Sequence, residues 1–445
     1  MNNEKFQDVL RNWTDDLPIC PLTGCGSVIN QMYSKDGRMK EMHINYEKKC
    51  YCSYDTENFL YSICSGINGA NISDFALSRM TADILLGGQL NQVGKPDEEI
   101  KELLRQTFIS AEKGYNTTID NLLATKQQLQ YQILDLSQYE ISQKYQDVLN
   151  RLNVITKELS IGSSVLIALI TNKKLFIANL GVCRALIVKN DSRNEDVLRV
   201  IQVTVDHNLL NEDEYVRLCN LGLDISSLQS SLPTTRCIGN YLGKGGYKDS
   251  ELFSQSSGEV ISSNPEIIGP ISLDDSVRFL LLLSGGLCKV LSQLFSNDLN
   301  IVNKELVQIC VQQFNKQSTL VGVAQSVTNI LAQLHHDLYM KSKVNGIDCS
   351  FDSREDMTLL IRNFSFPMPN SIENSKNSTA SSTISGSQIG TITSYSSTNT
   401  SVNYGVGEKQ TRPYVSFKEY FENVEMARKE GRLPKNIEFD DEPLE

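Results

Sequence analysis

Residues 162–189 read GSSVLIALITNKKLFIANLGVCRALIVK and give the clearest indication of the fold class. Two apolar runs rich in β-branched residues, Ser163–Ile170 and Lys174–Ala178, are separated by Thr171-Asn172, which is typical of a hairpin turn. A third run of the same kind, Ala185–Lys189, follows at once. The stretch therefore predicts a β-hairpin followed by a further strand.

The remaining elements lie on both sides of this stretch. Further strands are predicted at Val197–Val205, Val277–Leu283 and Met357–Arg362, the last of them able to form a sheet edge. Helical periodicity predicts helices at Asn71–Leu86, Pro96–Leu123, Tyr145–Leu159, Glu212–Leu221, Asn303–Phe314 and Thr319–Leu338. Strands grouped in hairpins with helices between the groups indicate an α+β fold in layers.

Composition excludes several classes of function. The 445 residues carry a formal net charge of -11, which argues against nucleic-acid binding, because affinity for phosphates needs an excess of Lys and Arg. The first ten residues do not form a signal peptide, and no apolar stretch is long enough to span a membrane. The 11 cysteines form no CxxC pair, so we expect free thiols in the cytoplasm, with a zinc site as the weaker alternative.

The composition changes twice along the chain. Residues 1–366 have the mixture of apolar, charged and turn residues that a folded domain needs. Residues 367–411 are rich in Ser, Thr, Asn and Gly and almost uncharged, so we expect a disordered linker. Residues 412–445 regain aromatic side chains and end in an acidic segment. Three regions are therefore predicted: a large domain, a linker and a tail.

Four segments in the large domain resemble, in the same order, the framework of the metal-dependent Ser/Thr protein phosphatases of type 2C. They are Gly162-Ser163-Ser164, Ala178–Ala185, Asp206-His207 and Glu355-Asp356-Met357-Thr358. The resemblance implies a four-layer α-β-β-α sandwich over roughly Trp13 to Phe366. It also implies a site at one end of the sheets that holds two Mg²⁺ or Mn²⁺ ions.

The positions that carry the chemistry in this family differ here. The resemblance places Ser27 at the position of the family's phosphate-binding Arg. It places Gln31 and Met32 at the positions of a Glu and an Asp. Ile67 stands at the position of a His. Ser65 and Gly285 stand at two metal-binding Asp positions, so only Glu355 keeps a carboxylate. Two divalent ions need several anionic oxygen ligands. We therefore expect no metal, no cofactor and no catalysis, with a divergent active phosphatase as the alternative.

Other polar motifs are expected to be structural. Asp206-His207 is interpreted as a turn and cap, with Asn211 and Glu214 at capping-box spacing before a helix. Glu355-Asp356 is expected to be a solvated turn with a local ion pair to Arg354. The adjacent His335-His336 cannot chelate together on a helix. Gly243-Lys244-Gly245-Gly246 lacks the spacing of a phosphate loop and is expected to be a flexible turn.

The tail carries the strongest positive indication of function. Pro413 favours an extended start, Ser416 and Glu419 have capping-box spacing, and an apolar face follows with helical periodicity. The residues expected to bind a partner are Tyr414, Val415, Phe417, Tyr420, Phe421 and Val424. A short amphipathic helix of this kind suits a groove on another protein. The alternative is that the tail folds back onto its own domain.

A phosphatase-like domain with such a tail resembles the pseudophosphatases that bind and activate the transforming-growth-factor-β-activated kinase. The segment Trp13-Thr14-Asp15-Asp16-Leu17-Pro18 adds to this resemblance. It implies a cytoplasmic, non-catalytic adaptor that activates a MAP kinase kinase kinase in stress or innate-immune signalling through its tail. It also implies an inhibitor-of-apoptosis protein and a stress-activated MAP kinase as further partners.

Overall fold

The structure is a computed structural model that divides the chain into two units, Met1–Ile384 and Ser385–Glu445. It describes residues 22–33, 39–41, 47–53, 58–86, 96–191, 197–228, 231–296, 298–344 and 351–369. All of these belong to the first unit. The residues predicted to form the tail, including Tyr414 to Val424, lie outside the described residues, as does the linker beyond Pro369.

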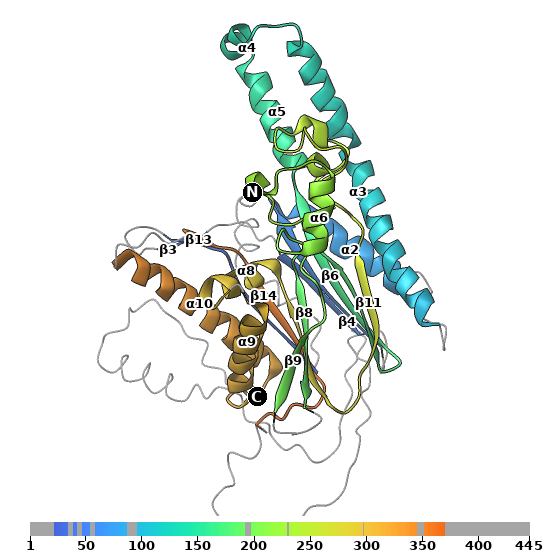
Figure 1. The fold of residues 1–445 in the computed structure, drawn as a ribbon, viewed down its shortest axis with the longest axis vertical. Helices are drawn as coiled ribbons and strands as arrows, with labels where there is room; N and C mark the ends of the chain where they lie inside the picture. The colour runs from blue at the N-terminus through green and yellow to red at the C-terminus, as the bar shows by residue number, and fades with distance from the viewer. Residues whose placement is uncertain are drawn as a thin grey trace, which may run out of the picture. The chain divides into compact units, whose positions relative to one another are not determined.

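The described strands form two large sheets and one small one (Figure 1). The first large sheet has the order β1 (Thr23–Val28), β14 (Met357–Asn363), β12 (Val277–Leu283), β8 (Arg184–Asn190), β9 (Leu198–Gln202). The second has the order β11 (Glu266–Ser272), β7 (Lys174–Leu180), β6 (Gly162–Thr171), β5 (Phe59–Ile67), β4 (Glu47–Ser53), and β10 (Ile238–Gly239) pairs with β6. The small sheet joins β13 (Ser353–Arg354), β2 (Gln31–Tyr33) and β3 (Met39–Glu41). All pairings between these strands are antiparallel.

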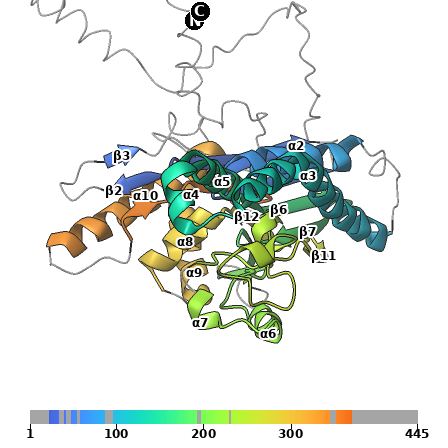
Figure 2. The same ribbon diagram turned by 90° about the horizontal axis from the view of Figure 1, so that it is seen from above.

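Two groups of helices cover the outer faces of the large sheets (Figures 1 and 2). The second sheet is covered by α2 (Asn71–Leu86), α3 (Asp97–Ile133) and α5 (Gln146–Leu159). The short helix α4 (Gln138–Lys144) lies between α3 and α5 in the sequence and at the tip of their projection, away from the sheet. The first sheet is covered by α8 (Gly285–Leu294), α9 (Leu299–Phe314) and α10 (Leu320–Val344). The short helices α6 (Glu212–Asn220) and α7 (Ile225–Leu228) lie in the connection between β9 and β10.

The alternation of side chains along β6 explains the layers. Val165, Ile167 and Leu169 pack into the core beneath the α2–α5 helices. Leu166, Ala168 and Ile170 point the other way, into the core between the two large sheets. Successive side chains of a strand face opposite sides of its sheet, so a strand buried on both sides must be apolar throughout. This arrangement is the predicted four-layer α-β-β-α sandwich, and the prediction is confirmed.

Most predicted helices and strands are present, but their first or last residues differ from the prediction. The helix predicted at Pro96–Leu123 continues to Ile133 as α3, and α9 begins at Leu299, four residues before the predicted start. The strand at Met357–Arg362, predicted to be able to form a sheet edge, is instead central: β14 lies between β1 and β12 and is buried. Strands β1, β4, β5 and β11, helix α8 and several shorter elements were not predicted. The expectation of free thiols is confirmed for seven cysteines whose side chains the structure describes, and of these seven only Cys219 is exposed.

Strand β1 has glycines where helix α10 crosses it. A Cβ atom on Gly24 would lie 2.2 Å from the carbonyl carbon of Leu320, and one on Gly26 would lie 2.3 Å from that of Ala324. Both distances are far shorter than any van der Waals contact. The two glycines, one strand repeat apart, therefore allow α10 to lie directly on the β1 backbone.

This close approach makes Gly26 sensitive to substitution. We expect Gly26→Val to lower the free energy of unfolding by about 3 kcal/mol or more, because α10 would have to move away from the sheet. Urea denaturation would measure the change, with Ile29→Val at the exposed position after β1 as the control. A Gly26→Val protein as stable as the native one would contradict the proposed contact.

Candidate functional site

The positions predicted to correspond to metal ligands meet at one end of the sandwich. Ser65 lies near the end of β5, and Gly285 begins α8 directly after β12. A Cβ atom on Gly285 would lie 3.4 Å from Ser65 Oγ, which is ordinary van der Waals contact. Gly286, one residue further, lies against Glu355, since its Cβ would be 3.2 Å from the Glu355 Cβ. The structure thus brings together Ser65, Gly285 and Glu355, which are far apart in sequence.

Glu355 already has a cationic partner. Lys289, one turn into α8, places Nζ 2.5 Å from Glu355 Oε1, and both side chains are about half exposed. The predicted ion pair between Glu355 and Arg354 is wrong. Arg354 is buried and donates to the Ile29 carbonyl at 2.8 Å. Lys289 was not foreseen as the partner because α8 and the β13–β14 turn meet only in the folded chain.

Asp356 also differs from the expected solvated turn. Its carboxylate is buried and accepts hydrogen bonds from the backbone N–H of Asn30 at 2.7 Å and from the Asn30 side chain at 2.8 Å. These bonds join the start of β14 to the loop after β1. Only Glu355 of this pair is solvated.

The other predicted site positions have structural contacts. The backbone of Ser27 exchanges hydrogen bonds with the Gln325 side chain of α10. Gln31 and Met32 belong to the small sheet, where they pair with Arg354 and Ser353. Ile67 packs against the apolar cluster beneath α6 and α7. These contacts join strands and helices. None of the four residues Ser27, Gln31, Met32 and Ile67 has an ionisable side chain.

The donor set at this end of the sandwich does not fit two divalent cations. A hydroxyl stands at residue 65, no side chain stands at residue 285, and the Glu355 carboxylate is paired with a lysine. Within the described ranges, no three His, Cys, Asp or Glu side chains are placed to hold a metal ion. Hard divalent ions require several oxygen ligands, and a nearby ammonium would repel them. No catalytic step that depends on such ions follows from these residues.

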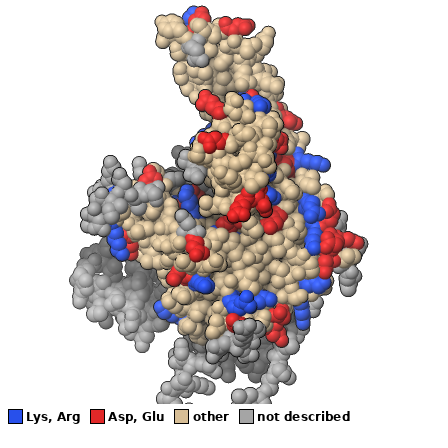
Figure 3. All heavy atoms as spheres, viewed as in Figure 1, with Lys and Arg blue, Asp and Glu red and all other residues tan. Residues whose placement is uncertain are grey.

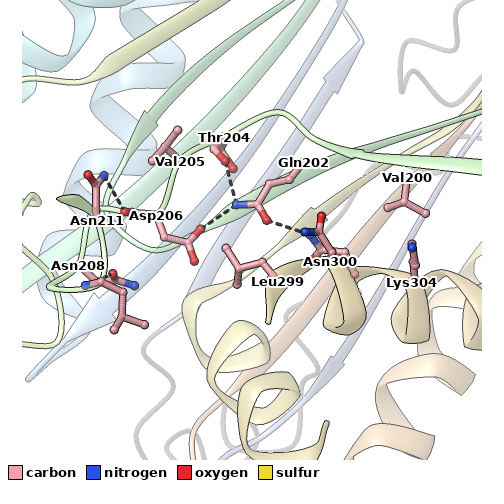
Figure 4. A pocket seen from close by; sticks show the side chains of 12 residues that line it. Val200, Gln202, Thr204, Val205, Asp206, Asn208, Asn211, Leu299, Asn300 and Lys304 are labelled. Atoms are coloured by element: carbon pink, nitrogen blue, oxygen red, sulfur yellow. Dashed lines mark hydrogen bonds between the residues drawn. The ribbon is translucent and has the colours of Figure 1, made fainter. Parts of the chain in front are cut away.

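A closed ring of polar side chains lies beside this region, and the sequence analysis missed it. Buried Arg184 bonds Asp206 Oδ2 at 2.6 Å and Asn303 Oδ1 at 3.0 Å. Asn303 donates to Gln202 at 2.9 Å, and Gln202 donates back to Asp206 at 3.3 Å (Figure 4). The ring connects β8, β9, the following loop and α9. Asp206 is thus bound to a structural cation.

His207 and Asn211 have structural roles. His207 is buried, and its Nδ1 accepts a hydrogen bond from the backbone N–H of Gly181 at 3.0 Å. Asn211 caps α6 by accepting from the N–H groups of Asp213 and Glu214, as predicted. The capping box itself does not form. The buried Glu214 carboxylate instead binds Arg217 and Arg236, at 2.8 and 2.6 Å.

Two histidines and one glutamate are among the buried groups with shifted pKa values. Burial lowers the pKa of His207 to about 4, and Arg236 acts in the same direction. Burial also lowers the pKa of His335 to about 4, assisted by Arg354. Burial alone would raise the pKa of Glu214, but hydrogen bonds from Arg217 and Arg236 prevail and lower it to about 2. Both histidines are therefore neutral and Glu214 is ionised near neutral pH.

The glycine-rich segment at residues 243–246 is not an anion site. It lies between two short 3-10 turns, and Gly246 packs on the ring of Tyr241. Lys244 is buried, with Nζ 2.6 Å from Glu112 Oε1 of α3. The expected turn is present, but it is packed and its lysine is already neutralised.

The surface provides no broad basic area on the face seen in Figure 3, where Lys and Arg lie in small groups among Asp and Glu. In the described parts of the chain, none of the helices has the length and apolar character needed to cross a bilayer.

A family model described as "Protein phosphatase 2C" matches residues 26–329, and the chain belongs to this family. It is similar to "TGF-beta-activated kinase 1 and MAP3K7-binding protein 1" of Caenorhabditis elegans, with 24% identity over 78% of this chain and 82% of that protein. It is also similar to "Probable protein phosphatase 2C 27" of Oryza sativa subsp. japonica, with 25% identity over 42% of this chain and 51% of that protein. The solved serine-threonine phosphatase 2C of Toxoplasma gondii has a TM-score of 0.46 and 13% identity, covering 76% of this chain and 93% of that one.

The two ion pairs described above should differ in strength. We expect Arg184→Ala to lower the free energy of unfolding by about 3–5 kcal/mol, because it leaves the mostly buried Asp206 carboxylate without its cation. Lys289→Ala should cost less than about 1 kcal/mol, since that pair is half exposed. Urea denaturation of both variants measures the difference, and equal losses would contradict the assigned roles.

Stability should decrease in mild acid. A histidine with a folded-state pKa near 4 and an ordinary value of 6.5 stays neutral in the folded chain while the unfolded chain takes up a proton. The free energy of unfolding should therefore fall as the pH drops from about 6.5 to 4, by on the order of 2–4 kcal/mol for each histidine. Glu214 contributes only at lower pH, between about 4.5 and 2.

Denaturation at pH 7.0 and pH 5.0 would measure this dependence. We expect His207→Asn to reduce the difference in stability between the two pH values, because the variant has no imidazole to protonate. His336→Gln, at a half-exposed position, is the matched control. The assignment is wrong if His207→Asn shows the same pH dependence as the native chain.

Proposed function

We propose that this protein is a non-catalytic, cytoplasmic adaptor that binds and activates a MAP kinase kinase kinase in stress or innate-immune signalling. The observation that carries the non-catalytic part of the proposal is the Lys289–Glu355 ion pair at the end of the sandwich, beside Ser65 and Gly285. An ammonium group provides the positive charge that metal ions would otherwise supply, but it cannot coordinate a water molecule and lower its pKa as a divalent ion does.

The similarity to a binding protein of a TGF-beta-activated kinase supports a kinase as the partner. The proposed contact is the tail helix, with Tyr414, Val415, Phe417, Tyr420, Phe421 and Val424 facing the kinase domain. Burial of its aromatic side chains would remove about 400–500 Å² of apolar surface from water. At about 25 cal/mol per Å² this exceeds the usual cost of ordering a short helix, so an affinity of about micromolar or better is expected.

The tail can be tested with two aromatic substitutions. We expect Phe417→Ala with Phe421→Ala to weaken binding of the full-length protein to the kinase domain by about 30-fold or more, since each residue is expected to act as a buried anchor. Isothermal titration calorimetry measures the change. Lys418→Ala, between the two anchors on the polar side of the predicted helix, is the control and should bind as the native chain does.

Unchanged binding of the double variant would remove the tail from the proposal. Binding that is lost equally in the Lys418→Ala protein would show that the assumed helix face is wrong. The inhibitor-of-apoptosis protein and the stress-activated MAP kinase stay predictions that follow from the resemblance alone.

The absence of catalysis can be tested by adding back carboxylates. We expect no saturable Mn²⁺ binding to the native chain in calorimetry, and binding at about millimolar affinity or tighter in a variant with Ser65→Asp, Gly285→Asp and Lys289→Ala. The variant gains two carboxylates that face each other beside a freed Glu355. Saturable Mn²⁺ binding to the native chain, together with turnover of an aryl phosphate, would favour the alternative of an active phosphatase.

A further inference from the structure

Strand β9 is the last strand of the first sheet and is bonded to β8 on one side. Val203 N–H donates to the Ala185 carbonyl at 2.9 Å, which fixes the register at one end of the pair. At the other end, Asp191 N–H donates to the Val197 carbonyl at 2.7 Å. Bonded and non-bonded residue pairs alternate along an antiparallel ladder, so the odd-numbered residues of β9 bind β8. The backbone groups that point away from β8 belong to Leu198, Val200 and Gln202.

This outward row of backbone groups is available for pairing. Outside the ladder with β8, no residue in the described ranges exchanges a backbone hydrogen bond with Leu198, Val200 or Gln202. An edge with unpaired N–H and C=O groups is a template to which another extended chain can add as a strand.

A groove lies on each face of β9. The inner groove, on the face toward the second sheet, has a volume of about 570 Å³. Val203 packs against the core between the two sheets. Because side chains alternate along a strand, Arg199 and Ile201 lie on this same face, and both line the inner groove.

Three cations line the inner groove, one from each of three neighbouring strands. They are Lys189 of β8, Arg199 of β9 and Arg278 of β12. Lys189 lies directly opposite Arg199 in the ladder, and like charges in that position disfavour strand pairing. An anion between these side chains removes the repulsion.

The acidic residues of this chain do not neutralise all three cations. Asp274 Oδ2 is 3.8 Å from Lys189 Nζ, and its side chain is 59% exposed. Asp191 and Asp275 also line the inner groove. Arg199 is exposed and forms no ion pair with any described residue. The inner groove therefore favours a further anionic side chain.

The outer groove lies on the opposite face of β9, between the strand and α9, and has a volume of about 550 Å³ (Figure 4). Its polar floor belongs to the closed hydrogen-bond ring described above and is already satisfied. Val205 and Leu210, which line it, are 46% and 81% exposed. Its one lining cation is Lys304 of α9. The outer groove thus offers exposed apolar walls and one charge, whereas the inner groove offers three cations.

We propose that the free edge of β9 binds an extended segment of a partner protein whose side chains alternate between acidic and apolar. The segment adds to the five-stranded sheet as a further strand and pairs with the outward backbone groups of β9. Facing residues of paired strands share one face, so side chains opposite Arg199 enter the inner groove and side chains opposite Val200 enter the outer groove. Carboxylates then reach the cations, and apolar side chains reach the outer walls. This contact is independent of the proposed kinase-binding tail.

A nine-residue synthetic peptide of alternating Glu and Val, carrying a fluorescent label, is the probe. Fluorescence anisotropy with the full-length protein should show saturable binding with a dissociation constant below about 1 mM. Val200→Pro should weaken binding by about tenfold or more, because it removes an outward N–H. Proline is tolerated on an edge strand where its nitrogen faces away from the sheet, so the fold should persist. Val200→Thr keeps the N–H and is the matched control.

Exchange of the charge tests the inner groove separately. Arg199→Glu should weaken binding of the Glu-Val peptide and strengthen binding of an alternating Lys-Val peptide, which the native chain should bind more weakly than the Glu-Val peptide. Arg151→Glu, an exposed position on α5 over the other sheet, should change neither result. Circular dichroism verifies the fold of each variant.

Three results would overturn the proposal. The first is no saturable binding of the Glu-Val peptide to the native chain up to about 1 mM. The second is binding that neither Val200→Pro nor Arg199→Glu alters. The third is a dimer in sedimentation equilibrium that Val200→Pro abolishes, because the edge would then be paired with a second copy of the chain.

Discussion

The packing of two large sheets through one apolar layer determines where every other part of this domain can lie. Leu166 and Ala168 of β6 face Leu280 and Leu282 of β12 across that layer. Once the sheets are stacked, the end of β5, the start of α8 and the start of β14 come together at the same end. The fold thus creates a shared site whether or not the residues there can perform chemistry.

The residues at that site, Ser65, Gly285 and Glu355, support the proposed non-catalytic function. The framework holds its geometry through contacts that do not need metal: the Gly286 backbone against Asp356, Asp356 bound to Asn30, and Arg184 bound to Asp206. The described contacts at this end of the sandwich therefore do not depend on bound metal ions. A protein can keep the sandwich as a scaffold while binding energy comes from another segment, which here is proposed to be the aromatic tail.

The sequence allowed the layers and most of their elements to be predicted, because buried strands such as β6 and β12 are apolar throughout and the helices are periodic. It could not reveal that β14 is central, since the order of strands in a sheet depends on contacts between distant segments. The predicted partner of Glu355 was wrong for the same reason, because Arg354 is adjacent in sequence but Lys289 is adjacent in space. The spacing of residues correctly predicted Asn211 as the cap of α6. It did not predict the role of Glu214, because its buried carboxylate binds two arginines instead of completing the capping box.

The most direct test of the central claim follows phosphate on the partner kinase. The purified kinase domain, ATP and Mg²⁺ are incubated with and without the full-length protein, and autophosphorylation of the kinase is measured over time. We expect faster incorporation of phosphate in the presence of the protein, and no removal of phosphate after ATP is exhausted, even with added Mn²⁺. Metal-dependent loss of phosphate from the kinase would contradict this expectation.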